Sequence, residues 1–203
     1  MSPERKYFDY IAGDYINTWV KSKKKAARVR RITSGFGLKK GMAVLEAGAG
    51  NGQFTPFILE RTGKKGKIHL VDYSEKMLKI AKKNLKNYPV KMSKSDVAEL
   101  PVKNRPYDMV LCFNSFPHFY PKEKTLKEFH RVLKKNGKLV VAHTARASYI
   151  NNMHAKYGFD MKKHYLPLKK EMQKLTDKTG FKIVSYYNKN YYLLKAVKIQ
   201  RGF

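Results

Sequence analysis

The stretch with the clearest potential for chemistry is A-V-L-E-A-G-A-G-N-G at residues 43–52. Its apolar residues indicate a short buried strand, which is followed by Glu46 and then by glycines at 48, 50 and 52. Glycine has no Cβ, so the backbone of such a turn can approach a ligand closely. A glycine turn at the carboxyl end of a strand predicts a site for a nucleotide-like ligand.

The spacing of the glycines excludes two common nucleotide motifs. A dinucleotide fingerprint, G-x-G-x-x-G, needs a third glycine at the position of Gln53, and a P-loop needs Gly-Lys-Ser/Thr, which does not follow. A second acid, Asp72, ends the next apolar run. A carboxylate at this place can accept hydrogen bonds from both hydroxyls of an adenosine ribose.

Four histidines follow the two predicted strands farther along the chain: His118, His143, His154 and His164. Three hypotheses remain open for them. One or two can act as a general base near neutral pH, three can bind a transition metal ion, or all can be interior side chains without a catalytic role. We take His118, His143 and His154 as the candidate catalytic residues and assign no metal site.

The elements that must position these residues alternate between strand and helix. We expect strands at 42–45, 68–72, 90–92, 107–114 and 138–143, with helices at 53–60, 74–87 and 121–135 between them. Gly137 is expected to stop the last of these helices, and Lys39-Lys40-Gly41 to close a basic helix before the first strand. Two helices, at 146–157 and 168–179, and two strands, at 181–187 and 191–199, should complete the chain. This order predicts a parallel α/β sheet covered on both faces.

Several of these segments carry a family resemblance. E-A-G-A-G-N-G resembles motif I of the class I methyltransferases that depend on S-adenosylmethionine (SAM), in which an acid precedes G-x-G-x-G. Ser95-Asp96-Val97 follows the third strand as in that family, and L-K-K-N-G-K-L-V-V at 133–141 resembles its L-K-P-G-G segment, with Lys135-Asn136-Gly137 in place of Pro-Gly-Gly. Five elements stand in the family's order between residues 42 and 143.

The resemblance implies a fold, a cofactor and a set of contacts. The fold is a three-layer, Rossmann-like α/β sheet of seven strands, mostly parallel with an antiparallel last strand. The cofactor is SAM, with Asp72 on its ribose and Asp96 near its adenine amino group. The implied cofactor-binding residues are Glu46, Gly48, Gly50, Gly52, Asp72, Tyr73, Asp96, Val97 and Asn114.

The 203 residues are expected to form one methyltransferase domain with three parts. Residues 1–41 would be an N-terminal helical cap, 42–143 the cofactor-binding core, and 144–203 the acceptor-side helices and the terminal strand pair. The aromatic segment 7–19 resembles an F-D-x-x-A-x-x-Y/W entry that folds over bound cofactor in many small-molecule methyltransferases, although it can equally serve only to cover the core. The cap and Tyr10 and Tyr15 within it are an alternative wall for the acceptor, with Asn114 and Phe116.

The expected reaction is in-line transfer of the SAM methyl group to a small-molecule acceptor, with a metal-linked acceptor kept open. Asn114 to Phe119 is not the Asn/Asp-Pro-Pro-Tyr/Phe motif of methyltransferases that act on exocyclic amines of nucleic acids. Two alternatives remain: an RNA methyltransferase that grips its substrate with a basic N-terminal helix, and a protein that binds SAM or nucleic acid without turnover.

Charge is the unusual feature of the composition. Forty-four Lys and Arg against 15 Asp and Glu give a net charge of +29, which attracts polyanions through a long-range field. Lysines occur in every region, but only K-S-K-K-K-A-A-R-V-R-R at 21–31 is dense enough to form a nucleic-acid-binding patch. No apolar run has the length of a membrane span, no signal peptide is visible, and the single cysteine, Cys112, lies in a predicted core strand. We therefore expect a reduced, cytoplasmic protein, and the sequence leaves its oligomeric state open.

Overall fold

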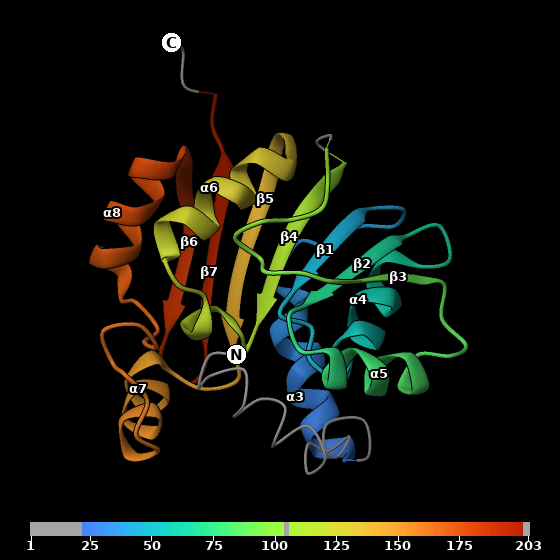
Figure 1. Ribbon diagram of the computed structural model, residues 1–203, viewed down its shortest axis with the longest axis horizontal. Coiled ribbons are helices and arrows are strands. Elements are labelled where there is room, and N and C mark those ends of the chain that lie inside the picture. Colours follow the sequence, from blue (N-terminus) through green and yellow to red (C-terminus); the bar gives the residue numbers. More distant parts are fainter. Residues whose placement is uncertain (1–21, 104–105, 201–203) are drawn as a thin grey trace.

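The computed structural model describes residues 22–103 and 106–200, and it confirms the α/β fold (Figure 1). One sheet of seven strands has the order β3-β2-β1-β4-β5-β7-β6. The first five strands run parallel to their neighbours, and β7 is antiparallel to both β5 and β6. The strands are β1 (Ala43–Ala47), β2 (Lys67–Asp72), β3 (Val90–Lys94), β4 (Tyr107–Phe113), β5 (Leu133–His143), β6 (Phe181–Asn188) and β7 (Tyr192–Lys198).

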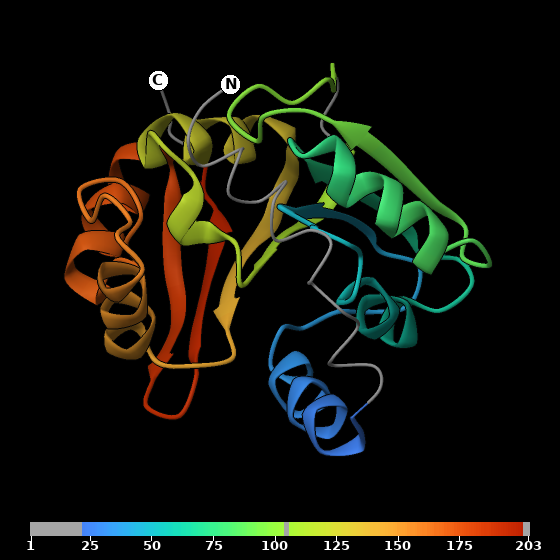
Figure 2. The ribbon, with the colours of Figure 1, turned by 60° about the horizontal axis from the view of Figure 1, so that its bottom comes forward.

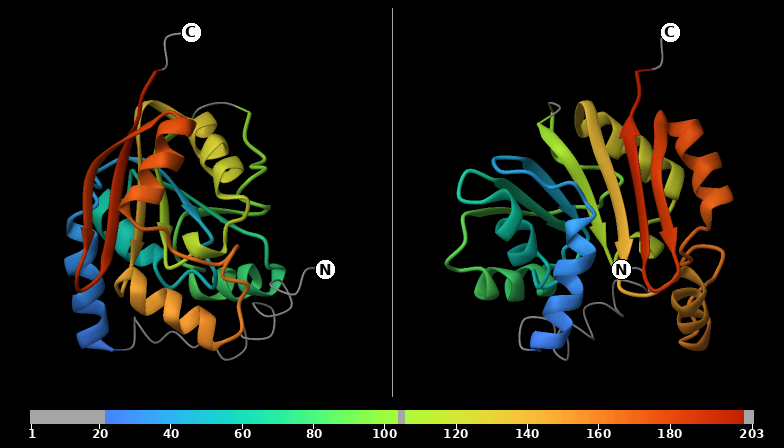
Figure 3. Two further views of the ribbon diagram at one scale, coloured as in Figure 1. Left: turned by 90° about the vertical axis from the view of Figure 1, so that its left-hand side faces the viewer. Right: turned by 180° about the vertical axis from the view of Figure 1, so that it is seen from behind.

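Helices cover both faces of this sheet, which gives three layers (Figures 2 and 3). The described α-helices are α3 (Lys23–Ser34), α4 (Thr55–Thr62), α5 (Glu75–Asn84), α6 (Lys122–Val132), α7 (Ala147–Lys156) and α8 (Lys169–Thr179), and a short 3-10 helix, η1, spans Phe116–His118. No helix of the described residues is both long enough and apolar enough to cross a membrane.

The two faces bury two separate apolar clusters. Alternate residues of β4 show the division, because Met109 and Leu111 lie in the cluster under α3, α4 and α5, whereas Val110 and Cys112 lie in the cluster under α6, α7 and α8. Side chains along a strand point to opposite faces, so both faces of a central strand must be apolar when both are covered. This explains why the strands of the core read as continuous apolar runs.

Helix α5 illustrates how local sequence sets the ends of an element. The Ser74 side chain accepts a hydrogen bond from the backbone N–H of Met77, and Glu75 stands in the first turn, where a negative charge is favourable. Met77, Ala81 and Leu85 are buried on its inner side, but Tyr88 is 43% exposed. The N-cap predicted at Ser74 is confirmed, and the helix ends at Asn84, before the position set by Pro89.

Two predicted helix ends are wrong. Helix α3 ends at Ser34, where the N–H groups of Gly35 and Phe36 donate to the carbonyls of Ile32 and Thr33, so Lys39-Lys40-Gly41 lies in a later turn. Helix α6 ends at Val132, and Gly137 lies within β5. The pairing of β4 with β5 passes from Tyr107↔Leu133 directly to Met109↔Lys138, so the residues around Gly137 form an irregularity in the strand.

The N-terminal cap can be followed only in part, because residues 1–21 lie outside the described residues. The aromatic segment 7–19, with Tyr10 and Tyr15, therefore stays a prediction. The basic stretch does form a helix, α3, which packs Ala26, Val29 and Ile32 against the core. The division into a cofactor-binding core and acceptor-side elements stays a prediction.

Candidate active site

The glycine loop after β1 is fastened to the end of β2 by Asp72. One carboxylate oxygen of Asp72 accepts from the N–H of Gly50 at 2.8 Å, and the other accepts from the N–H of Ser74 at 2.9 Å. Parallel pairing of β1 with β2 brings the two carboxyl ends to the same edge of the sheet, so this contact bridges 22 residues of chain. The acid and the glycines that the sequence singled out therefore form one structure.

The glycines of this loop are needed for different structural reasons. Gly48, Gly50 and Gly52 all have positive φ, of 67°, 56° and 75°. A Cβ on Gly52 would lie 2.7 Å from a methyl carbon of Leu85, whereas a Cβ on Gly50 would meet no atom within 4 Å. Gly52 is thus required by packing, and Gly50, which lines the cavity described below, leaves room for a ligand.

This difference gives a paired prediction. Gly52→Ala should lower the melting temperature, because the added methyl group collides with α5. Gly50→Ala adds only the strain of a positive φ, roughly 1 kcal/mol, but places a methyl group at the cavity wall, so it should weaken SAM binding more than it lowers stability. Calorimetry and thermal unfolding of both variants check this. Equal loss of SAM affinity in both would contradict the assignment.

Glu46 is buried at the base of the loop. It is 2% exposed, and its Oε2 accepts a hydrogen bond from Thr55 Oγ1 at 2.8 Å. Burial penalises the carboxylate and raises the pKa of Glu46 to about 8; the Thr55 hydrogen bond lowers it, and the charge of Asp72 raises it further. At pH 7 the carboxyl group of Glu46 is therefore mostly protonated.

Cofactor binding should change the protonation of Glu46. SAM carries a positive sulfonium, and a positive charge in this cavity favours the carboxylate, so a proton should leave as SAM binds. SAM affinity should then increase as pH rises from 6 towards 8, and calorimetry in buffers of different ionisation enthalpy should detect the released proton. Glu46→Gln stays neutral and should lose this pH dependence; a variant that kept it would contradict the prediction.

The ends of β4 and β5 close the site from the other side. Asn114 has a φ of 55°, and its side-chain oxygen accepts from the N–H of Thr144 at 2.9 Å, which ties the two strand ends together. Ser115 Oγ donates to the carbonyl of Ala47 at 2.8 Å, and thereby holds the next turn against β1. These contacts fix the start of the segment that carries His118.

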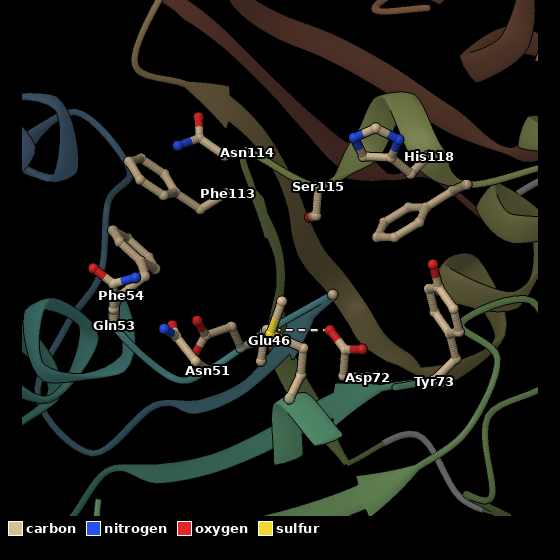
Figure 4. A pocket seen from close by; sticks show the side chains of 15 residues that line it. Glu46, Asn51, Gln53, Phe54, Asp72, Tyr73, Phe113, Asn114, Ser115 and His118 are labelled. Carbon is tan, nitrogen blue, oxygen red and sulfur yellow. Dashed lines mark hydrogen bonds between the residues drawn. The ribbon is translucent and has the colours of Figure 1, made fainter. Parts of the chain in front are cut away.

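Two cavities meet at this edge of the sheet. Figure 4 shows the first, where Glu46, Asp72, Tyr73, Asn114 and His118 surround a common space. The second has a volume of about 350 Å³ and extends past Asp96, Val97 and Tyr120 to Lys163 and His164. Five residues line both cavities: Gly48, Asp72, Tyr73, His118 and Phe119. The two cavities together form the candidate active site.

Most of the predicted cofactor residues lie in these walls. Gly52 lines neither cavity, because it packs against Leu85. Asp96 is exposed, and its Oδ1 accepts from the N–H of Ala98 at 2.8 Å. The walls of the first cavity also contain residues that sequence reasoning missed: Ala49, Asn51, Gln53, Phe54, Met77, Phe113, Ser115 and Phe119. Of these residues, only Asn51, Gln53 and Phe54 had a signal in the sequence, because they lie beside the last glycine of the motif.

The four histidines do come together. The ring of His118 lies 4.8 Å from that of His154 and 5.6 Å from that of His164, measured between ring centres. Phe159 packs against these three rings. His143, His154 and His164 are 2–4% exposed, and only His118, which is partly exposed, reaches the first cavity. We call these four residues the histidine cluster.

Burial keeps much of the cluster neutral. It lowers the pKa of His143 to about 3, and holds the pKa of His118 well below its usual range with help from the neighbouring cluster residues and Lys122. Burial also lowers the pKa of His154. Nε2 of His143 has no hydrogen-bond partner among the described residues. No group of three His, Cys, Asp or Glu side chains in residues 22–103 and 106–200 is placed to hold a metal ion.

A buried lysine fixes the segment around the cluster. Lys122 is 6% exposed, and its ammonium donates to the carbonyls of Pro117, Phe119 and Lys163 at 3.1, 3.4 and 2.6 Å. Burial lowers its pKa to about 8. Lys122 therefore joins η1 to the loop that carries His164. No pattern in the sequence indicates this role, because a lysine in a lysine-rich helix looks like a surface residue.

Comparison with known proteins agrees with this geometry. The family model of the methyltransferase domain matches residues 38–180. The chain is 25% identical over 193 residues to a ubiquinone/menaquinone biosynthesis C-methyltransferase of Haemophilus ducreyi, covering 82% of this chain and 73% of that protein. It is 36% identical over 115 residues to an uncharacterized methyltransferase-like protein of Schizosaccharomyces pombe, covering 57% of this chain but only 43% of that relative's length.

Solved structures share the fold. A putative methyltransferase from Haloferax volcanii, solved with the Trm112 methyltransferase activator, matches with a TM-score of 0.79 and 14% identity over 95% of this chain and 98% of that one. A SAM-dependent methyltransferase from Aquifex aeolicus matches with a TM-score of 0.69 and 22% identity over 84% and 89% of the two chains. The chain belongs to the methyltransferase domain family. Its cofactor is SAM, as the sequence predicted.

Proposed function

We propose that the protein transfers the methyl group of SAM to a small-molecule acceptor that binds between Tyr73 and the histidine cluster. The observation that carries this proposal is the second cavity. It shares Gly48, Asp72 and Tyr73 with the cofactor walls and continues to His118 and His164, so its far part has room for an acceptor of small-molecule size. The Haemophilus ducreyi relative, whose name describes C-methylation in quinone biosynthesis, supports an acceptor of this size class.

Methyl transfer from SAM requires the protein mainly to position the acceptor and the cofactor. The methyl group on a sulfonium is already electrophilic, so the site must hold the acceptor atom in line with it and exclude water. Phe119 lines both cavities, and the buried ring of Phe116 packs edge to face against it. Cys112 is fully buried and burial raises its pKa, so it is not a nucleophile in this proposal.

A labelled-methyl experiment tests this acceptor class. The protein would be incubated with tritiated SAM and cell extract, and label would be counted in RNA, in protein and in ultrafiltrate products separated from unreacted SAM by chromatography. The proposal expects label in the ultrafiltrate, abolished by Asp72→Ala and unaffected by ribonuclease. Label that appears only in RNA would overturn it, and no label in any fraction would favour a SAM-binding protein without turnover.

RNA methylation is the second candidate, favoured by the net charge of +29 and by three exposed lysines of α3, Lys23, Lys24 and Lys25. The basic helix is less available than its sequence indicates. Arg28 donates to the carbonyls of Thr144 and Asn190 at 2.8 and 3.0 Å, and Arg30 forms an ion pair with Glu60 at 2.7 Å. Both arginines therefore have structural partners.

The lysines of α3 allow a specific prediction. If they contact RNA, changing Lys23, Lys24 and Lys25 to Gln should reduce the slope of log affinity against log salt by up to about 2 to 3, since each phosphate contact contributes roughly 0.7 to 0.9. Filter binding with a structured RNA at several salt concentrations measures this. A matched change of Lys169, Lys170 and Lys174 on α8 to Gln is the control. If both triple variants lower the slope equally, α3 is not the RNA grip.

A further inference from the structure

Of the three candidate catalytic histidines, His118, His143 and His154, only His118 can meet an acceptor. His118 lines both cavities, and His164 lines the second, whereas His143 and His154 line neither. Figure 4 shows the imidazole of His118 beside Ser115, on the side of the cavity opposite Asn51 and Gln53. The three histidines proposed from the sequence as catalytic are thus not equivalent.

His154 has a fixed orientation behind His118. Its Nδ1 donates to the backbone carbonyl of His164 at 2.7 Å, so in the neutral ring Nε2 is the nitrogen that can accept a proton. The ring is 4% exposed and stands 4.8 Å from His118 between ring centres. A carbonyl that sets the tautomer of a buried imidazole in this way is typical of a positioning interaction.

We propose that His118 is the general base of methyl transfer and that His154 is a positioning residue that orients it. The inference rests on the proposed function, because it needs an acceptor in the second cavity. It also narrows the acceptor class. The acceptor must carry a proton that it loses during the reaction, as on a hydroxyl, a thiol, a ring nitrogen or an acidic carbon.

The step balances without any further reactant. The bond from the acceptor atom to the methyl carbon forms as the bond from sulfur to that carbon breaks, and the electron pair of the broken bond stays on sulfur to give S-adenosylhomocysteine. The acceptor proton moves to His118. One positive charge therefore leaves the sulfonium and one appears on the imidazole, so the buried site keeps its net charge.

This exchange of charge explains how a histidine with a lowered pKa can serve as base. Before the reaction, the groups that face His118 are His154 on α7, His164 in the following loop, His143 on β5 and Lys122 on α6. Burial disfavours an imidazolium most, and these groups add to that effect, so the pKa of His118 is lowered. A bound sulfonium would lower it further, so His118 begins the reaction neutral and able to accept a proton. Loss of the sulfonium charge makes that proton more stable on His118 at the moment when it arrives.

The pair of cofactor states provides a test that needs no acceptor. Nuclear magnetic resonance of histidine-labelled protein, with the His118 signal assigned from His118→Gln, would follow the ring through a pH titration with saturating SAM and again with S-adenosylhomocysteine. Removing the sulfonium charge from the cavity that His118 lines should raise the pKa of His118 by about one unit or more. His130 on α6, outside the cluster, is the internal control and should not move.

The outcomes distinguish failure of the proposed function from failure of the base assignment of His118. If calorimetry shows no SAM binding, the proposed function itself fails. If both cofactors bind and the His118 signal does not shift, His118 is not close enough to the sulfonium and the base assignment is overturned. The base assignment is also overturned if purified, untagged protein holds a transition metal ion on the histidine cluster.

The role of His154 is tested by two substitutions. His154→Asn keeps a side-chain donor for the carbonyl of His164, and His154→Leu removes it. With an acceptor from the labelled-methyl screen, His118→Gln should lower kcat by roughly 10²- to 10⁴-fold with little change in the Kd for SAM. His154→Leu should shift the pH profile of kcat, and His154→Asn should restore it. A fall in melting temperature alone, with unchanged kcat in both, would assign His154 a structural role.

Discussion

Asp72→Ala is expected to weaken SAM binding by roughly 10- to 150-fold, which is the worth of losing about 1.5–3 kcal/mol of charge-assisted hydrogen bonding. The carboxylate stands at the carboxyl end of β2, where an acid can accept the ribose hydroxyls of an adenosine ligand, and it lines both cavities. It also holds the N–H groups of Gly50 and Ser74, so the variant loosens the glycine loop as well as removing a ligand contact. Calorimetry with SAM measures the change.

The chain offers a matched control for this variant. Asp108 likewise accepts from a backbone N–H, that of Ala43 at 2.8 Å, and forms an ion pair with Lys134 at 2.7 Å, but it lies at the start of β4, away from the cofactor edge. Asp108→Ala should lower the melting temperature with no loss of SAM affinity. Should Asp72→Ala and Asp108→Ala reduce SAM affinity equally, the effect on Asp72 would come from general destabilisation.

The cofactor half of the site could be predicted from the sequence because its signals are local. A glycine with positive φ, an acid at a strand end and a helix cap each depend on residues within a few positions of the chain. Gly48, Asp72 and Ser74 are such residues, so a local sequence pattern indicates the role of each. The parallel sheet then brings these positions to one edge. The family model and the shared fold confirmed the family and the cofactor.

The acceptor half could be predicted only as a set of residue types. His118 and His164 come from η1 and from the loop after α7, and nothing in their spacing states that Lys122 ties those two segments together. The sequence likewise gave His118, His143 and His154 equal standing, although only His118 lines the cavities. Such differences depend on tertiary packing, which a single sequence does not encode in any local pattern.

The same limit explains the error at Gly137. A glycine after an amphipathic run commonly ends a helix, but here α6 already ends at Val132 and the chain enters β5 directly. A Cβ on Gly137 would lie 2.9 Å from the carbonyl oxygen of Lys134, so the glycine is required by the strand irregularity. The local pattern indicated that a glycine is needed at this position. It did not indicate that a strand irregularity, and not a helix end, requires the glycine.

Acid should destabilise the protein strongly through the histidine cluster, and His143 gives the sharpest case. Its pKa is about 3 in the folded protein and about 6.5 in an unfolded chain, so between these values the unfolded state binds a proton that the folded state does not. Stability is therefore complete above pH 6.5 and is lost as pH falls. From this residue alone the free energy of unfolding should drop by about 2 kcal/mol between pH 7 and pH 5, and His118 and His154, whose pKa values are also lowered, should add to the loss.

Urea unfolding at pH 7 and pH 5, followed by circular dichroism, measures this loss. His143→Leu removes the buried titrating group and its unpartnered Nε2, so the variant should lose about 2 kcal/mol less than the parent protein over the same pH change. Tyr192→Phe is the matched control. The Tyr192 ring packs edge to face against that of His143, with 6.4 Å between ring centres, and the Tyr192 hydroxyl donates to the carbonyl of Pro167. Tyr192→Phe should lower stability by a similar amount at both pH values. If His143→Leu kept the full acid sensitivity, His143 would have to be protonated in the folded protein, and the neutral cluster on which the base assignment of His118 depends would be wrong.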